Sequence, residues 1–268
     1  MANDLVIHGA AGRMGRRLVA LSREFDALQL VGAIEYEGSP HLGKDAGVVA
    51  ETEPFEVEIT DALTQLKQGQ VVIDFSLPQS LSRLLPAVVD AGATLVCGTT
   101  GFSKEQVASL KEASNKIPVL YSPNMSVGVN LLFLAVREMT KWAGEDFDIE
   151  VFEMHHKMKR DAPSGTALRI AEHIADVQEQ RLADVMKTDR YSQDAPREAG
   201  EIGMQSARGG DIVGEHTVFY CGMGERIELT HRATSRDIFA RGALRAASWM
   251  AQKPAGFYSM FDVLSFAS

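Results

Sequence analysis

The chain has 268 residues, of which 45% are hydrophobic and 24% are charged, a composition typical of globular proteins and not of disordered or fibrous ones. Its formal net charge is −9 and it has no run rich in lysine and arginine, which disfavours general nucleic-acid binding. The longest apolar run, near residues 127–136, is about half a membrane span, and the N-terminus has no secretion-signal pattern. We therefore expect a cytoplasmic protein that binds neither membranes nor nucleic acid.

The first half of the chain alternates between strand and helix patterns. Strands are predicted over residues 4–9, 28–35, 71–76, 94–100 and 118–122. Helices are predicted between them, over 13–25, over 78–91 and from Ser103, where Gln106 completes a capping-box pattern. Because these strands are apolar on both faces, we expect a Rossmann-type doubly wound parallel sheet with helices on both sides.

The pattern changes after residue 126, where a second domain of the α+β class is expected. Its predicted elements are a helix over 127–142, a strand over 147–156, a helix over 164–180, a hairpin of 212–221 with 226–233, and a last helix over 235–252. Residues 181–199 are polar and mixed and are predicted to form a loop. Cys97 and Cys221 lie in apolar runs and are expected to be buried structural thiols.

The first candidate site is the glycine-rich turn Gly9-Ala10-Ala11-Gly12-Arg13-Met14-Gly15, between the first strand and the first helix. Glycines permit a tight turn there, and the N–H groups of a helix start attract a pyrophosphate. Glu35 ends the second strand, where an acid accepts hydrogen bonds from the ribose of a dinucleotide. Tyr36 and Glu37 follow, where a 2′-phosphate usually requires a cation, so the pattern favours NADH; Arg13 could still support NADPH.

Two short segments follow the predicted strands at their carboxyl ends. One contains Gly98, Thr99 and Thr100, and the other runs Ser122-Pro123-Asn124-Met125. Ligands of open α/β sheets bind at this edge, so both segments could line a nicotinamide pocket. Each is equally compatible with an ordinary loop.

The third candidate site is a basic cluster between a strand and a helix. It contains His155, His156, Lys157, Lys159 and Arg160. Strand alternation points the two histidines in opposite directions, and Ser164 is predicted to cap the following helix, whose N–H groups favour a carboxylate. The cluster suits a small dianion and an acid–base step, although a solvated basic loop is an alternative. Adjacent histidines are poor zinc ligands, so no metal is expected.

The other histidines are isolated in the sequence and are expected to be structural. They are His8, His41, His173, His216 and His231.

Together, these motifs resemble the dihydrodipicolinate reductase family of bacterial lysine and diaminopimelate biosynthesis. The resemblance rests on GAAGRMG at 9–15, GTTGF at 98–102, NMSVGVN at 124–130, HHKMKRDAPSGTAL at 155–168 and ARGGDIVGEH at 207–216, and it spans nearly the whole chain. It implies a dinucleotide-binding domain of residues 1–126, to which 237–268 return, and a substrate-binding and tetramerisation domain of residues 127–236.

The resemblance also implies the reaction, in which NADH or NADPH reduces a small cyclic dicarboxylate, 4-hydroxy-tetrahydrodipicolinate, with loss of water. His155 matches the family's proton donor, and Lys159 matches the second acid–base or charge-stabilising residue. The residues that match carboxylate binders are His156, Gly165 and Thr166. The residues that match cofactor binders are Gly9 to Met14, Glu35, Gly98, Thr99, Thr100 and Ser122 to Met125.

Two departures bear on the cofactor, because Tyr36 replaces a basic residue of many relatives and Ser76-Leu77-Pro78 lacks the arginine that some have. NADH is therefore expected to serve at least as well as NADPH.

Two other functions fit part of the sequence. One is a two-domain NAD-dependent dehydrogenase for a different small acid, which would not need the basic loop. The other is a dinucleotide sensor or scaffold without turnover, which would not need both His155 and Lys159.

Overall fold

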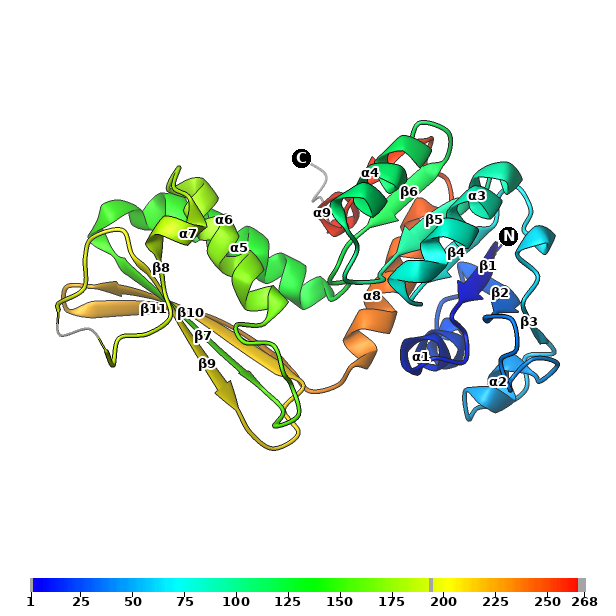
Figure 1. Cartoon of the computed structure of the whole chain (residues 1–268), viewed down its shortest axis with the longest axis horizontal. Coiled ribbons are helices and arrows are strands. Elements are labelled where there is room, and N and C mark those ends of the chain that lie inside the picture. Colours follow the sequence, from blue (N-terminus) through cyan, green and yellow to red (C-terminus); the bar gives the residue numbers. More distant parts are fainter. Residues whose placement is uncertain (1, 193–194, 265–268) are drawn as a thin grey trace. The chain divides into compact units, whose positions relative to one another are not determined.

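The computed structural model describes residues 2–192 and 195–264, which form two units. The first unit contains the described residues up to Val127 and those from Asp237 onward, and the second runs from Gly128 to Arg236 (Figure 1). Three parts of the predicted segments lie outside the described residues. These are residue 1 of 1–126, residues 193–194 of 127–236 and of its predicted loop 181–199, and residues 265–268 of 237–268. Within 2–192 and 195–264, no helix is both long and apolar enough to cross a membrane.

A seven-stranded sheet in the order β12-β6-β5-β4-β1-β2-β3 forms the centre of the first unit. The strands are β1 Asn3–His8, β2 Leu28–Ile34, β3 Ile59–Thr60, β4 Val71–Asp74, β5 Thr94–Cys97, β6 Pro118–Tyr121 and β12 Gly256–Tyr258. Every pairing is parallel, which confirms the predicted Rossmann-type sheet.

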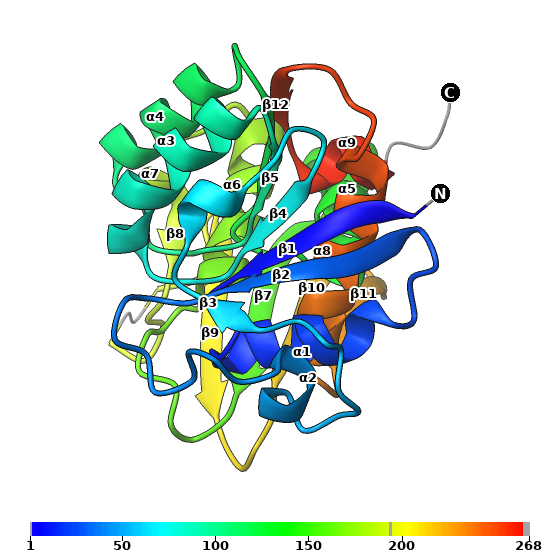
Figure 2. The same cartoon turned by 90° about the vertical axis from the view of Figure 1, so that its right-hand side faces the viewer.

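Helices cover both faces of this sheet (Figure 2). They are α1 Arg13–Ser22, α2 Ala46–Val49, α3 Leu81–Ala91, α4 Lys104–Ala113, α8 Asp237–Met250 and α9 Met260–Leu264, with 3-10 turns at Leu63–Gln65 and Pro78–Ser80. The capping box of Ser103 and Gln106 is present at the start of α4, as predicted.

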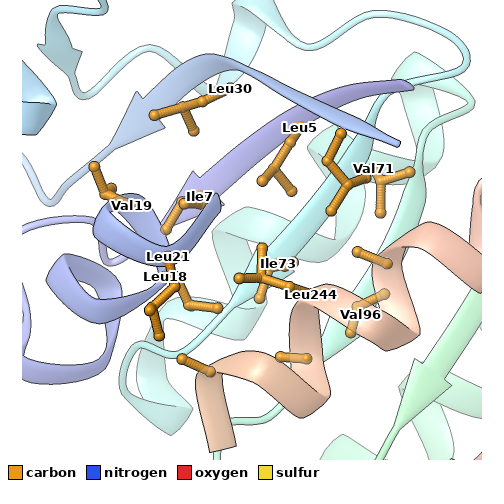
Figure 3. Packing of buried hydrophobic residues seen from close by; sticks show 14 of the residues in the cluster. Leu5, Ile7, Leu18, Val19, Leu21, Leu30, Val71, Ile73, Val96 and Leu244 are labelled. Carbon is orange, nitrogen blue, oxygen red and sulfur yellow. The ribbon is translucent and has the colours of Figure 1, made fainter. Parts of the chain in front are cut away.

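Side-chain alternation along the strands divides the core into two layers. Leu5 and Ile7 of β1 pack with Leu18 of α1 and Leu244 of α8 (Figure 3). Val6, between them in sequence, packs in the layer that contains residues of α3 and α4. Burial on both faces explains why these strands are continuously apolar.

A five-stranded sheet in the order β11-β10-β7-β9-β8 forms the second unit. Its strands are β7 Asp148–His155, β8 Met186–Lys187, β9 Ile202–Arg208, β10 Gly214–Gly222 and β11 Glu225–Ala233. Its helices are α5 Val127–Ala143, α6 Gly165–Val177 and α7 Leu182–Val185, with a 3-10 turn at Gly144–Asp146. Figure 1 shows α5 and α6 along one face of the sheet. The buried Tyr220 of β10 binds Thr140 and the carbonyl of Val136, which fixes α5 there.

The predicted hairpin is confirmed as β10 and β11, which pair antiparallel. The loop predicted over 181–199 is wrong in part, because it contains α7 and β8. β9 was not predicted: glycine and polar residues interrupt its apolar pattern, and its place is decided by parallel pairing with β7. The two-residue β3, the three-residue β12 and the short α2 and α9 are too brief for a periodic signal.

Truncation of Leu244 tests the division of the first core. Leu244 is completely buried, so Leu244→Ala is expected to reduce the free energy of unfolding by about 2–5 kcal/mol. Leu77 is 69% exposed, so Leu77→Ala is the matched control and should change it by less than about 0.5 kcal/mol. Urea denaturation measures both, and equal losses would contradict the packing of α8 in this core.

Candidate functional site

The glycine-rich turn lies between β1 and α1 in the first unit. Gly9 has a φ of +78°, and a Cβ on Gly15 would lie 2.0 Å from the Gly9 carbonyl oxygen, so the helix packs directly on the turn. Gly12 is the N-cap of α1 and has no side chain to bind the first N–H groups. These groups are therefore oriented for an anion such as a pyrophosphate.

Glu35 follows β2 and contacts this turn. Its Oε1 accepts a hydrogen bond of 2.8 Å from the Ala11 N–H, and its Oε2 accepts one of 3.2 Å from the Tyr36 N–H. The structure thus brings together the two parts of the predicted dinucleotide motif. The Tyr36 side chain is 63% exposed.

Two arginines accompany this turn. Arg13 is exposed in the first turn of α1. Sequence reasoning missed Arg16, whose Nε donates to the Ala11 carbonyl at 2.8 Å and whose Nη2 lies 3.4 Å from His41 Nε2. The helical spacing of three residues from Arg13 could have indicated it.

A buried carboxylate supports the carboxyl end of the sheet. Asp74 at the end of β4 accepts hydrogen bonds from His8 Nδ1 at 2.7 Å, Ser76 Oγ at 2.5 Å and Thr99 Oγ1 at 2.7 Å. Burial raises the pKa of Asp74, but His8 and the two hydroxyls outweigh it and keep the pKa below its usual value. His8 is a buried structural histidine, as expected. The Thr99 hydroxyl is committed to Asp74, so only the Thr99 backbone can contact a ligand.

The two predicted loops follow the neighbouring strands β5 and β6. The Ser122 N–H donates to the Cys97 carbonyl at 3.2 Å, and the Ser122 hydroxyl donates to the Asn124 carbonyl at 2.8 Å. Met125 is buried in the core, so its side chain does not line a pocket. Thr100 and Pro123 are exposed at this edge.

Gly98 and the two cysteines differ in how closely they are packed. Gly98 packs against the Phe75 ring, which a Cβ would approach to 2.3 Å. Cys97 is buried, and burial raises the pKa of its thiol, whereas Cys221 is only partly buried, against expectation.

The basic cluster lies in the second unit between β7 and α6. Ser164 caps α6, as predicted, by accepting a hydrogen bond of 3.2 Å from the Ala167 N–H. Gly165, the first residue of the helix, is exposed, and nothing lies within 4 Å of the point where its Cβ would be. The first turn of α6, Gly165 and Thr166 included, therefore starts beside open space, which suits a carboxylate.

The adjacent histidines point in different directions, as strand alternation predicts. His155 is buried, whereas His156 is half-buried with its Nε2 at 3.4 Å from Arg236 Nη2. A Cβ on Gly214 would lie 2.9 Å from His155 Nε2, so this glycine makes room for that nitrogen. Lys159 Nζ binds Asp161 at 2.9 Å.

Glu153, two residues before His155, was not singled out from the sequence. It is completely buried, accepts a hydrogen bond from His155 Nδ1, and pairs with Arg208 at 2.8 and 2.9 Å. Burial raises the pKa of Glu153, but hydrogen bonds from Arg208, Ser206 and His155 together outweigh it, so the pKa lies below its usual value. Burial, together with the cations Lys159 and Arg208, lowers the pKa of His155 by more than Glu153 raises it, so the unliganded imidazole is neutral near pH 7.

His216 is isolated in the sequence, but the fold brings it into contact with His155. Its ring meets that of His155 edge-on, with centroids 5.2 Å apart, and its Nε2 lies 3.2 Å from Ser164 Oγ. Ser164 Oγ also accepts from the Ala167 N–H, so this hydroxyl joins the start of α6 to His216. The antiparallel pairing of β10 with β7 creates this contact, and no local sequence pattern reveals it.

Metal ligation has no support in the described parts of the chain, where no group of three or more histidine, cysteine, aspartate or glutamate side chains is arranged to hold an ion.

The buried His216 makes stability depend on pH. Burial, followed by the nearby His155, lowers its pKa to about 3, whereas a histidine in an unfolded chain titrates near 6.5. The unfolded state therefore binds the proton first, and the stability that neutral His216 contributes is present above about pH 6.5 and lost as the pH falls toward 3.

We expect His216→Gln to destabilise the protein at about pH 7.5, and the difference from wild type to narrow by about 1 kcal/mol or more at about pH 5. Urea denaturation at the two pH values measures it. A difference that stays constant or widens would contradict a neutral buried imidazole.

Models of one family match both parts of the chain. Residues 3–125 match "Dihydrodipicolinate reductase, N-terminus", and residues 128–264 match "Dihydrodipicolinate reductase, C-terminus". The 4-hydroxy-tetrahydrodipicolinate reductase of Anaeromyxobacter dehalogenans (strain 2CP-1 / ATCC BAA-258) is 50% identical over 261 residues, 97% of each chain. That of Syntrophotalea carbinolica is 49% identical over 97% of this chain and 98% of its own.

A solved structure has the same fold. It is a dipicolinate-bound dihydrodipicolinate reductase from Paenisporosarcina sp. TG-14, with a TM-score of 0.75 and 23% identity over 98% of this chain and 99% of that one. With both family models and these relatives in agreement, the chain belongs to the dihydrodipicolinate reductase family.

Proposed function

We propose that this chain reduces 4-hydroxy-tetrahydrodipicolinate to tetrahydrodipicolinate with a nicotinamide cofactor, in lysine and diaminopimelate biosynthesis. Membership of the family supports the reaction. The observation that carries the proposal in the structure is His155, buried against Glu153 beside Lys159 and the open N-terminus of α6. An acid–base group, a cation and helix N–H donors are what a dicarboxylate reductase needs in one place.

The cofactor belongs to the first unit in this proposal. The α1 N-terminus, with residues 9–14, holds the pyrophosphate, and Glu35 accepts the ribose hydroxyls. Gly98, Thr99 and Thr100, with Ser122 to Met125, hold the nicotinamide side, in part through their backbones. When bound, the reduced nicotinamide supplies a hydride to C4 of the substrate.

The dicarboxylate belongs to the second unit. Its two carboxylates bind Lys159, His156 and the N–H groups of Gly165 and Thr166. Lys159 Nζ donates to Asp161 in the unliganded protein and has further N–H groups to offer a carboxylate. The negative charge of the substrate raises the affinity of His155 for a proton. Water departs as the C4 hydroxyl together with a proton from the neighbouring carbon, which leaves a double bond between these two carbons. His155 Nε2 then delivers its proton to that neighbouring carbon as hydride is added at C4, so the double bond is reduced.

The sheet of the second unit offers a surface for assembly. One face carries α5 and α6, and within the described residues of that unit no helix lies over the other (Figure 1). β11 alternates between exposed and half-buried residues along its length. We propose that copies meet through this sheet in a homotetramer, and that the enzyme works in the cytoplasm without binding membranes or nucleic acid.

The activity is tested by loss of NADH absorbance, with substrate freshly made from pyruvate and aspartate semialdehyde by the preceding synthase. Wild type should turn over, and His155→Ala should lower kcat by about 10²–10⁴-fold because the proton donor is lost. Met158→Ala, at a residue 75% exposed, is the control for changes in the same loop. Cofactor binding without turnover in wild type would favour a sensor, and an unchanged kcat in His155→Ala would remove the histidine from its role.

Cofactor preference depends on the residue after Glu35. Tyr36 offers no cation to a 2′-phosphate, so NADH is expected to give a kcat/KM equal to or above that of NADPH. Tyr36→Arg should shift the ratio toward NADPH by about tenfold, the value of one charge-assisted contact, and Tyr36→Phe should not. A wild type that clearly prefers NADPH would assign the phosphate to Arg13 or Arg16 instead.

A further inference from the structure

The carboxylate of Glu153 lies behind His155 with all its acceptor positions in use. Oε2 accepts from His155 Nδ1 and from Arg208 Nη1 at 2.9 Å. Oε1 accepts from Arg208 Nη2 at 2.8 Å and from the Ser164 N–H at 3.3 Å. One buried anion is thus shared between an imidazole and a guanidinium, and strengthening either interaction weakens the other.

Arg208 also holds the loop that carries Lys159. Its Nη2 donates to the Asp161 carbonyl at 2.6 Å, and its Nη1 donates to the Ala207 carbonyl at 2.6 Å. The Asp161 side chain in turn binds Lys159 Nζ. A single guanidinium at the end of β9 therefore contacts both the carboxylate behind His155 and the loop of the second cationic residue.

This arrangement determines which nitrogen of His155 is available. A carboxylate accepts only, so the His155 proton lies on Nδ1 and Nε2 is left bare, on the side where Gly214 makes room. A proton destined for substrate must be added at Nε2, and its affinity depends on the charges around the ring.

We propose that Glu153 and Arg208 act as one positioning pair, in which the carboxylate fixes the orientation and tautomer of His155 and the guanidinium limits how strongly the ring holds its second proton. The inference rests on the proposed function in taking His155 as the proton donor. An acid that held its proton too tightly would not release it to carbon, and one that held it too weakly would not be charged at neutral pH.

The charges that face His155 support opposite effects of Glu153 and Arg208 on its proton affinity. In the described residues the titratable groups around the ring are Glu153 on β7, Arg208 on β9, His216 on β10 with His231 beyond it on β11, and Lys159 with Asp161 in the loop. His216 stays neutral, since burial lowers its pKa to about 3. Glu153 is the anion that raises the pKa of His155, and Arg208 and Lys159 are cations that lower it.

The test is a titration of the imidazole nitrogens by ¹⁵N NMR on the unliganded protein, with His155 assigned by its loss in His155→Gln. Arg208→Gln should raise the His155 midpoint and Glu153→Gln should lower it, each by about one pH unit or more. Glu153→Gln should also move the neutral-state proton partly from Nδ1 to Nε2. The double variant should have a His155 midpoint close to that of wild type. Because it leaves no unpaired buried charge, it can still be titrated if a single variant does not fold.

Two controls separate charge from general damage. Arg208→Lys keeps the cation but loses the fork geometry, so its midpoint should stay near wild type while kcat falls. Arg226→Gln removes an exposed cation from β11 and should move nothing. In the NADH assay, kcat/KM falls on the alkaline side of its pH profile. The pH of this fall should move up in Arg208→Gln and down in Glu153→Gln, as the NMR midpoints do.

Midpoints that shift in the same direction, or no further than in Arg226→Gln, would overturn the positioning pair. The NMR result needs no substrate, so it stands or falls separately from the proposed reaction. If the NMR midpoints shift in opposite directions but wild type shows no turnover, the proposed reaction is rejected and the positioning pair of Glu153 and Arg208 is retained.

Discussion

The arrangement of the second unit depends on one buried carboxylate, that of Glu153. A completely buried anion is tolerated only when it is paired and hydrogen-bonded. Glu153 meets this condition through partners from three segments, namely His155 on its own strand, Arg208 on β9 and the backbone of Ser164 at the start of α6. Because each partner is held by the same anion, His155, the neighbouring strand β9 and the start of α6 are positioned together.

The first unit uses a similar solution at a different place in its sheet. Asp74 is buried at the end of β4 and collects donors from β1, from the residues after its own strand and from the loop after β5. The carboxylate thereby stabilises three strand ends beneath the edge where ligands of such sheets bind. In both units, a charge that is costly to bury makes the local geometry specific.

Burial also explains how the histidines differ although their intrinsic chemistry is the same. Burial outweighs the effect of the Glu153 anion on His216, so this imidazole remains neutral and packs edge-on against the His155 ring. His155 has an anion at Nδ1 and a glycine, Gly214, beside Nε2, so Glu153 favours a second proton on this ring. His156 follows the strand and is half-buried, with its Nε2 3.4 Å from Arg236 Nη2.

The sequence alone was sufficient for features that depend on local pattern. Periodicity predicted the parallel sheet and most helices, turn chemistry predicted the glycine loop, and capping preferences predicted the starts of α4 and α6 at Ser103 and Ser164. These signals are local because backbone conformation and side-chain alternation are set by near neighbours. The likeness of the basic loop to a known family then indicated His155 and Lys159.

Only the tertiary structure decided which distant residues meet. Pairing of β9 and β10 on either side of β7 brings Arg208 and His216 to His155, across gaps of more than about 50 residues that no periodic pattern spans. The same pairing turned Glu153 from one acid among many into a completely buried carboxylate beside His155. In the first unit, packing placed the Met125 side chain in the core. Long-range contacts are selected by the packing of whole elements, so their chemistry becomes visible only when the fold is complete.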